Sequence, residues 1–325
     1  MPTGKSFFQN MNEIRSLLIN DQWIVSLRGN KNQVNPLRPY GWLVEKERTI
    51  TGKIEDTGII FLTNRECPFH CLMCDLWKNT TDESVPVGAI PAQIEWALGQ
   101  MPEVKHVKLY NSGSFFDIRA IPEEDYKEIA SLLKNFKTVI VESHPRMIND
   151  KCLKFRNMLS PELHIALGLE TVHHEILMKL NKQMTVDDFS NSVSFLTKNG
   201  IHSRAFILLR PPLLSESEGI YWAERSIDFA FSSGVECCTI IPVRGGNGAM
   251  DFLMKKGDFN LPHIKSLEEV LEYGIELKSG RVFADVWDLG IFSKCNKCIE
   301  LRTKRLTEMN LSQEIITPIK CECNY

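Results

Sequence analysis

A chain of 325 residues is long enough for one large α/β domain, or two smaller ones, with a substantial buried core. The formal net charge of −3 excludes an overall positive field of the kind that draws proteins to nucleic acid, although a local basic face stays compatible with it. No apolar run approaches the 18 residues of a membrane span, and residues 1–20 are polar and mixed in charge. The sequence therefore predicts a cytoplasmic protein without membrane association.

Residues 1–55 show no regular repeat and predict an N-terminal extension packed on the main domain. Their apolar pattern predicts a short helix over Met11–Ile19 and strands over Trp23–Leu27 and Trp42–Glu47. The extension also carries several basic side chains, for which a solvated surface and contact with the phosphate backbone of a substrate are the two interpretations. These side chains are Arg28, Lys31, Arg38 and Arg48.

Residues 56–285 alternate short apolar strands with helical segments, which predicts an α/β fold with a parallel sheet and right-handed crossovers. The six predicted strands are Gly58–Leu62, Val104–Tyr110, Thr138–Glu142, Leu163–Glu170, His202–Leu209 and Val235–Pro242. The predicted helices are Pro91–Met101, Pro122–Phe136, Val186–Asn199, Gly219–Ser232 and Ile264–Ser279.

Three cysteines directly after the first predicted strand are the most specific feature of the chain. Cys67, Cys71 and Cys74 have the spacing C-x3-C-x2-C, and thiolates are the ligands of iron–sulfur clusters. Three thiolates leave one iron of a four-iron cluster without a protein ligand, and an open metal position is where chemistry takes place. A zinc knuckle is the alternative, but zinc sites usually have four ligands in paired spacings, and the nearest further ligand here is His70.

A second group of cysteines lies in residues 286–325, which predict a C-terminal metal-binding tail. Cys295 and Cys298 form one pair, and Cys321 and Cys323 form another. Four thiolates in two pairs make a complete tetrahedral set. A structural zinc ion and an auxiliary iron–sulfur cluster both fit this set.

Further candidate residues follow the other predicted strands, because ligands of parallel α/β folds bind at the carboxyl ends of strands. After the sixth strand comes a glycine-rich loop over residues 242–248, which is either a ligand-binding loop or a plain connector. The remaining candidates at or after strand ends are Asn111, Ser112, Gly113, Glu142 and Glu170, and Arg204 on the fifth strand is a further one.

These features resemble the radical S-adenosylmethionine (radical SAM) family. The cysteine spacing is similar to the cluster-binding loop of that family, with Met73 where an aromatic residue usually precedes the last cysteine. Glu142–Pro145 resembles the E-x-x-P segment of the subgroup that contains the Elongator-type enzymes and the tRNA methylthiotransferases. Gly168–Thr171 and Leu177–Lys182 resemble the G-x-E-[ST] strand and the downstream L-x-x-[LM]-N-[RK] segment of the same subgroup.

The resemblance implies a partial (β/α)6 TIM-like barrel with a 4Fe–4S cluster on Cys67, Cys71 and Cys74. The cluster would cleave SAM with one electron, from a donor such as a ferredoxin or flavodoxin, and the resulting 5′-deoxyadenosyl radical would remove a hydrogen from the substrate. The residues implied in SAM binding are Asn111, Ser112, Gly113 and Glu142 at the amino group, Glu170 at the ribose hydroxyls and Arg204 at the carboxylate. No further catalytic side chain is indicated.

Other segments resemble the archaeosine-forming radical SAM enzymes, from about residue 20 to residue 325. These segments are Arg28–Asn32, Phe61–Cys67, Cys74–Thr80 and Ala284–Leu289. The resemblance implies a modified nucleobase as substrate: a lysine-linked 7-deazaguanine in tRNA, cleaved at a C–N bond alongside a partner tRNA-modifying enzyme. Two alternatives stay open, a radical SAM enzyme acting on a small nucleoside or natural product and a non-catalytic metal-binding module.

Overall fold

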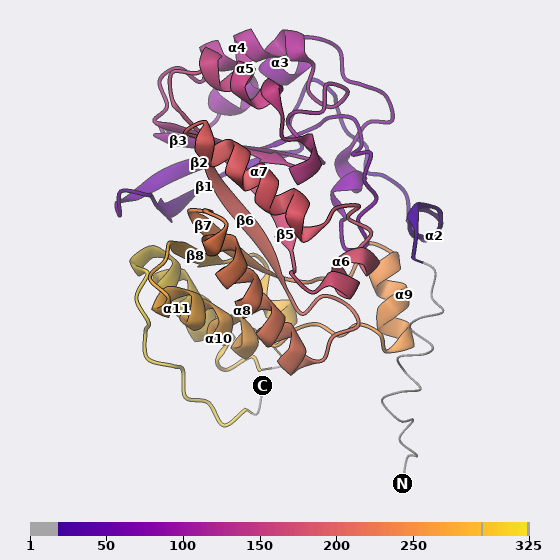
Figure 1. Ribbon diagram of the computed structural model, residues 1–325, viewed down its shortest axis with the longest axis vertical. Coiled ribbons are helices and arrows are strands. Elements are labelled where there is room, and N and C mark those ends of the chain that lie inside the picture. Colours follow the sequence, from indigo (N-terminus) through magenta and orange to yellow (C-terminus); the bar gives the residue numbers. More distant parts are fainter. Residues whose placement is uncertain (1–18, 294, 324–325) are drawn as a thin grey trace.

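The computed structural model describes residues 19–293 and 295–323, and one eight-stranded sheet lies at its centre (Figure 1). The strands follow one another in the sheet in chain order, β1 pairs antiparallel with β2, and every later neighbour is parallel. Their bounds are β1 Gly41–Arg48, β2 Ile54–Leu62, β3 His106–Asn111, β4 Thr138–Ser143, β5 Glu162–Glu170, β6 His202–Leu209, β7 Cys237–Pro242 and β8 Arg281–Ala284.

Helices join the parallel strands, and α7 and α8 cross the front of the sheet in Figure 1. Both begin at capping boxes, in which Thr185 and Ser215 accept hydrogen bonds from backbone N–H groups of the first turn. The helices are α2 Asp21–Ser26, α3 Ala89–Leu98, α4 Tyr126–Leu132, α5 Asp150–Met158, α6 His174–Lys179, α7 Val186–Lys198, α8 Glu216–Ser232, α9 Ala249–Lys256, α10 Ile264–Glu276 and α11 Ile299–Ser312. None of the helices in the described ranges combines the length and apolar character needed to cross a bilayer.

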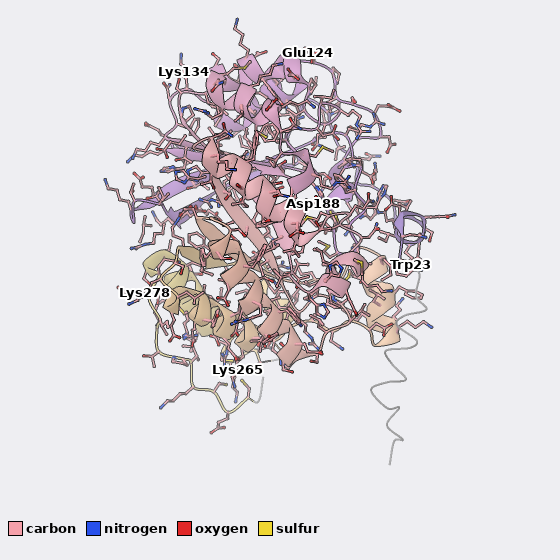
Figure 2. All side chains as sticks on the ribbon, in the orientation of Figure 1. Trp23, Glu124, Lys134, Asp188, Lys265 and Lys278 are labelled. Atoms are coloured by element: carbon pink, nitrogen blue, oxygen red, sulfur yellow. The ribbon has the colours of Figure 1, made fainter. Side chains whose placement is uncertain are left out.

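The two faces of the sheet differ in character, because successive side chains of a strand point to opposite faces. One face carries the main apolar core, which includes Val107, Leu109, Val139, Val141, Ile165, Leu167, Ala205 and Ile207. The other face carries buried polar side chains such as Lys108, His164 and Arg204. Charged side chains such as Lys134, Lys265 and Lys278 are exposed and lie on the outside of the molecule (Figure 2).

The six predicted parallel strands are confirmed, and the sheet has two further strands at its edges. Trp42–Glu47 was predicted as a strand and lies within β1, so the N-terminal region supplies one edge of the sheet. The other edge, β8, was missed because four residues are too few for a clear apolar pattern. Five predicted helices are present, while α5 and α9 were not predicted.

The predicted strand over Trp23–Leu27 is wrong, because this segment forms the helix α2. Asn20 caps the helix by accepting a hydrogen bond from the backbone N–H of Trp23 at 2.9 Å. Trp23 packs edge-to-face on Phe252 of α9, with ring centroids 5.6 Å apart, at the margin seen in Figure 2. A short apolar run is ambiguous between strand and helix, and the cap decides here. Most of the predicted helix over Met11–Ile19 lies outside the described residues.

Candidate active site and metal sites

The cysteine loop, residues 63–80, leaves the C-terminal end of β2 and carries Cys67, Cys71 and Cys74. Cys71 is buried, and the other two are partly buried. Burial raises the pKa of each thiol to about 12. Because metal ligation needs thiolates, a bound group must bring enough positive charge to deprotonate all three.

The spacing of these three sulfurs bears on whether a cluster or a single ion fits them. A tetrahedral ion about 2.3 Å from each thiolate holds the sulfurs about 3.8 Å apart. In the part of the chain that the structure describes, Cys67, Cys71 and Cys74 do not form a group within 4.8 Å. The wider arrangement suits a four-iron cluster, where each thiolate binds a different iron.

The turn after β3 supports the cysteine loop from one side. Asn64 donates a side-chain hydrogen bond to the carbonyl oxygen of Ser112 at 3.0 Å. Gly113 has a φ of +101°, and a Cβ atom at this position would lie 2.9 Å from Cys67 Sγ. Glycine is therefore required here by both its backbone conformation and the approach of Cys67.

The segment after β5 supports the loop from a second side. The backbone N–H of Leu72 donates to the carbonyl oxygen of Leu180 at 2.9 Å. The Asn181 side-chain amide donates to the carbonyl oxygen of His70 at 2.8 Å and to Asp21 of α2 at 2.6 Å. The L-x-x-[LM]-N-[RK] segment thus holds the cysteine loop and α2 together.

The glycine-rich loop after β7 supports the cysteine loop from a third side. The Asn247 side chain is buried and donates to the carbonyl oxygens of Leu72 at 2.8 Å and Cys74 at 3.1 Å. Gly248 has a φ of +88° and lies against the Leu27 carbonyl group, where a Cβ atom would not fit. Of the two interpretations of this loop, a plain connector does not account for these contacts.

A buried ion pair lies beside the cysteine loop. Glu170 ends β5 at an irregularity in the pairing with β6, and its φ of +66° is left-handed. Its carboxylate meets the ammonium group of Lys182 at 2.5 Å. Burial acts against the charge of Lys182, but Glu170 and then Cys71 outweigh it and raise the pKa of Lys182. Gly168 leaves room for this pair, because a Cβ atom there would collide with both charged groups.

Glu142 lies at the end of β4 and is partly buried. Burial raises the pKa of its carboxyl group to about 8, although the charge of Lys182 and the backbone N–H of Asn111 act in the opposite direction. At neutral pH the group is therefore mostly protonated. The backbone N–H of Phe115 donates to its carbonyl oxygen at 2.8 Å, which fixes Glu142 against the turn after β3.

Arg204 does not join this group. It is the third residue of β6, near the N-terminal end of the strand, and its guanidinium donates to Glu47 of β1 at 2.6 Å. Lys108 contacts the same carboxylate at 2.5 Å. Burial opposes ionisation of Glu47, but Arg204 and Lys108 outweigh it and lower its pKa. These residues lie at the end of the sheet where the parallel strands begin, whereas the cysteines follow the end of β2.

A cleft of about 490 Å³ borders the cysteine loop. Two of the four basic residues of the N-terminal region, Arg28 and Lys31, line it together with Arg65 and Arg119. Arg28 and Lys31 both contact Glu66, at 2.5 and 2.8 Å. The other two basic residues lie elsewhere, Arg38 over the ring of Trp96 and Arg48 against the carbonyl oxygen of Leu311.

No protein-family model matches the chain, but curated relatives exist. An uncharacterized protein of Methanocaldococcus jannaschii is 28% identical over 278 residues, spanning 78% of this chain and 74% of that protein. The archaeosine synthase subunit beta of Methanosarcina acetivorans is 27% identical over 216 residues, spanning 62% of this chain and 60% of that subunit. The same subunit of Thermococcus kodakarensis is 29% identical over 127 residues, spanning 37% of this chain and 39% of that subunit. The chain thus covers less than two thirds of either archaeosine synthase subunit.

Solved structures share the fold at lower identity. Methylornithine synthase (PylB) superposes with a TM-score of 0.53 and 16% identity, over 76% of this chain and 66% of its own. Elp3 of Methanocaldococcus infernus superposes with a TM-score of 0.51 and 17% identity, over 70% of this chain and 59% of its own. The chain is thus similar in sequence to archaeosine synthase subunit beta over part of its length, and it shares the fold of these two solved structures. The predicted α/β partial barrel is confirmed.

This fold brings together most of the predicted site residues. Asn111, Ser112 and Gly113 lie with Glu142 at the turn after β3, beside Cys67. Glu170 joins them through Lys182, whose charge acts on all three N-terminal cysteines. Lys182 was missed as a site residue, although it is the final residue of the motif that indicated the segment.

Asn181, Asn247 and Phe69 were also missed as residues that hold the candidate site together. Asn181 lies inside the same motif as Lys182, so its position was indicated. The Phe69 ring stacks on His144 at 3.8 Å between centroids. No local sequence signal identifies Asn247 or this stacked pair, because their partners are distant in the chain.

The four C-terminal cysteines converge on a single point. Their four sulfurs all lie within 4.8 Å of one another. The Sγ atoms of Cys295 and Cys321 are 3.7 Å apart, and those of Cys298 and Cys323 are 3.5 Å apart. These distances match the roughly 3.8 Å of a tetrahedral thiolate site. Backbone N–H groups of Cys298 and Lys297 lower the pKa of Cys295 to about 6, so this thiol is ready to bind metal at neutral pH.

Proposed function

We propose that Cys67, Cys71 and Cys74 hold a 4Fe–4S cluster and that SAM binds at its free iron. When bound, this pair of cofactors supplies a radical that removes a hydrogen atom from the substrate. The observation that carries the proposal is the convergence of three strand-end segments on the cysteine loop, since each makes a direct contact with it. Such convergence at the carboxyl ends of parallel strands is where ligands of these folds bind.

The chain offers suitable groups for each part of SAM. The turn over Asn111–Gly113 and Glu142 would meet the amino group, and Glu170 the ribose hydroxyls. Lys182 is better placed than Arg204 for the SAM carboxylate, because its charge acts on Cys67 and Cys71 while Arg204 is bound to Glu47. SAM is a cation at its sulfonium, so its arrival would favour ionisation of Glu142.

The proposed substrate is a modified nucleobase, most specifically a lysine-linked 7-deazaguanine in tRNA that undergoes archaeosine-type C–N bond cleavage. Two relatives bear the name archaeosine synthase subunit beta, which supports this choice. The cleft beside Cys67, with Arg28, Lys31, Arg65 and Arg119, supports a phosphate-bearing substrate. An electron donor such as a ferredoxin or flavodoxin, and a partner tRNA-modifying enzyme, belong to the same proposal.

The second proposed metal is a structural zinc ion on Cys295, Cys298, Cys321 and Cys323. The tight sulfur spacing supports a mononuclear ion over an auxiliary cluster, which would spread the four sulfurs further apart. Arg302 of α11 supports the site, because it donates to Cys298 Sγ at 3.4 Å and pairs with Glu268 of α10.

The test is anaerobic reconstitution followed by measurement of iron and of 5′-deoxyadenosine formed from SAM. The wild-type protein should cleave SAM, and a Cys67→Ala/Cys71→Ala/Cys74→Ala variant should not. A variant that still cleaved SAM would overturn the proposal, and a wild type without SAM affinity would favour the metal-binding module. Binding of tRNA that weakens steeply with salt would support the nucleic-acid substrate, while its absence would favour a small nucleoside or natural product.

A further inference from the structure

A second polar cavity, of about 500 Å³, lies where the parallel strands begin, at the end of the sheet away from the cysteine loop. Its lining includes Thr57 of β2, His106 of β3, Thr138 of β4 and the segment Ser160–Glu162 at the start of β5. The proposed radical chemistry assigns no role to this cavity.

Three potential metal ligands gather at this end of the sheet. Glu162 and His164 are two residues apart on β5, so their side chains lie on the same face. His202 begins β6 and pairs directly with His164 across the two strands. Glu162 Oε2 lies 3.8 Å from His164 Nε2, the two imidazole centroids are 4.9 Å apart, and one ligand atom from each residue lies within 4.8 Å of the others.

His164 is an unusual buried side chain. It is 2% exposed, and neither ring nitrogen has a hydrogen-bond partner among residues 19–293 and 295–323. Buried polar groups in folded proteins are nearly always paired, so an orphaned imidazole requires an explanation. A metal ion is one partner that uses an imidazole lone pair directly.

We propose that Glu162, His164 and His202 bind a divalent transition-metal ion of the zinc or ferrous type. Two imidazoles and one carboxylate are a common ligand set for such ions and leave further coordination positions open. A tetrahedral ion would need ligand atoms about 3.4 Å apart, close to the 3.8 Å between Glu162 and His164. Glu162 and His202 are exposed, so their side chains have room to adjust.

The surrounding charges permit a cation at this point. Two guanidinium groups lie near His164, but Arg204 is paired with Glu47 at 2.6 Å and Arg281 with Glu236 at 2.6 Å. Glu162 contributes a carboxylate that is not committed to either of these pairs. The ion would join the first residues of β5 and β6, two neighbouring strands in the middle of the sheet (Figure 1).

The test counts zinc on the full chain in a Cys295→Ser/Cys321→Ser background, which removes the thiolate site. Zinc is added in excess, loosely bound metal is removed by gel filtration, and bound metal and thermal unfolding are then measured. The parent should retain one equivalent that His202→Ala and Glu162→Ala each lose, and zinc should raise the Tm of the parent only. His174→Ala, which removes an exposed histidine on α6, should behave as the parent.

Both test substitutions lie at exposed positions, so the metal-free Tm should change little and serves as the folding control. Equal zinc content in the parent and in His202→Ala would overturn the proposal, as would a parent that retains no zinc. The result is independent of SAM cleavage, so failure here leaves the radical SAM proposal untouched.

Discussion

Lys182 and Glu170 form an ion pair at 2.5 Å in which the side chains are only 9% and 7% exposed. The pair joins the strained end of β5 to the segment that holds the cysteine loop through Asn181. Charges at this depth are stable only together, because each compensates for the desolvation of the other. The pair therefore links the folding of the barrel to the chemistry of the cysteine loop.

Replacement of Lys182 by methionine should cost about 3–5 kcal/mol of unfolding free energy, because Glu170 would be left as a buried, unpaired charge. Urea unfolding measures this change. The double variant Glu170→Gln/Lys182→Met should recover much of the loss, since no uncompensated charge remains, but it should not recover SAM binding.

The control for this experiment is Lys198→Met, which removes an exposed lysine from α7 and should change stability by less than about 0.5 kcal/mol. If Lys182→Met retained both wild-type stability and SAM affinity, the pair would have no role in the site.

The cysteine loop and the order of the parallel strands could be predicted because their signals are local. The spacing of Cys67, Cys71 and Cys74 and the alternation of strands and helices are both read from neighbouring residues. Arg204 shows where such reasoning fails. Its strand was predicted with the correct bounds, but Arg204 is the third residue of that strand and so lies near the end of the sheet where the parallel strands begin. There it meets Glu47 of β1, a strand that was predicted without its place in the sheet.

Gly113→Ala should prevent normal cluster assembly, because the added methyl group would lie 2.9 Å from Cys67 Sγ. A positive φ adds about 1–2 kcal/mol of backbone strain to this substitution. Gly257→Ala isolates that strain, since Gly257 has a φ of +82° with nothing within 4 Å of the added atom. Iron content after anaerobic reconstitution should fall for Gly113→Ala and stay normal for Gly257→Ala; equal iron in both would remove the steric argument.

The stability of the metal-free protein should depend on pH through Glu142. Its pKa rises from the ordinary value of 4.5 to about 8 in the fold, because burial disfavours the charged form. The folded state therefore holds a proton that the unfolded state releases, and this stabilisation is complete below pH about 4.5 and lost as pH rises to about 8.

Glu142→Gln replaces the titratable carboxyl group with a neutral amide and so isolates its effect. Relative to the variant, the free energy of unfolding of the wild type should fall by at most about 1.4 kcal/mol per pH unit between pH 5 and pH 8. Above pH 8 it should change little further. Urea unfolding of both proteins at several pH values measures the difference. Parallel profiles for the two proteins would show that Glu142 ionises normally in the fold.

The two metal assignments predict different iron counts. One cluster on the cysteine loop and one zinc ion on the C-terminal set give about four iron atoms and one thiolate-bound zinc per chain, whereas an auxiliary four-iron cluster would give about eight iron atoms and no thiolate-bound zinc. Cys321→Ser should lose the zinc of the C-terminal set and keep the iron, because the two cysteine groups belong to separate parts of the chain. Its C-terminal tail should also become more sensitive to protease, since the ion joins residues 321–323 to the start of α11. Cys152→Ala, at a buried cysteine outside both groups, should keep both metals. A loss of four iron atoms in Cys321→Ser would instead assign an iron–sulfur cluster to the tail.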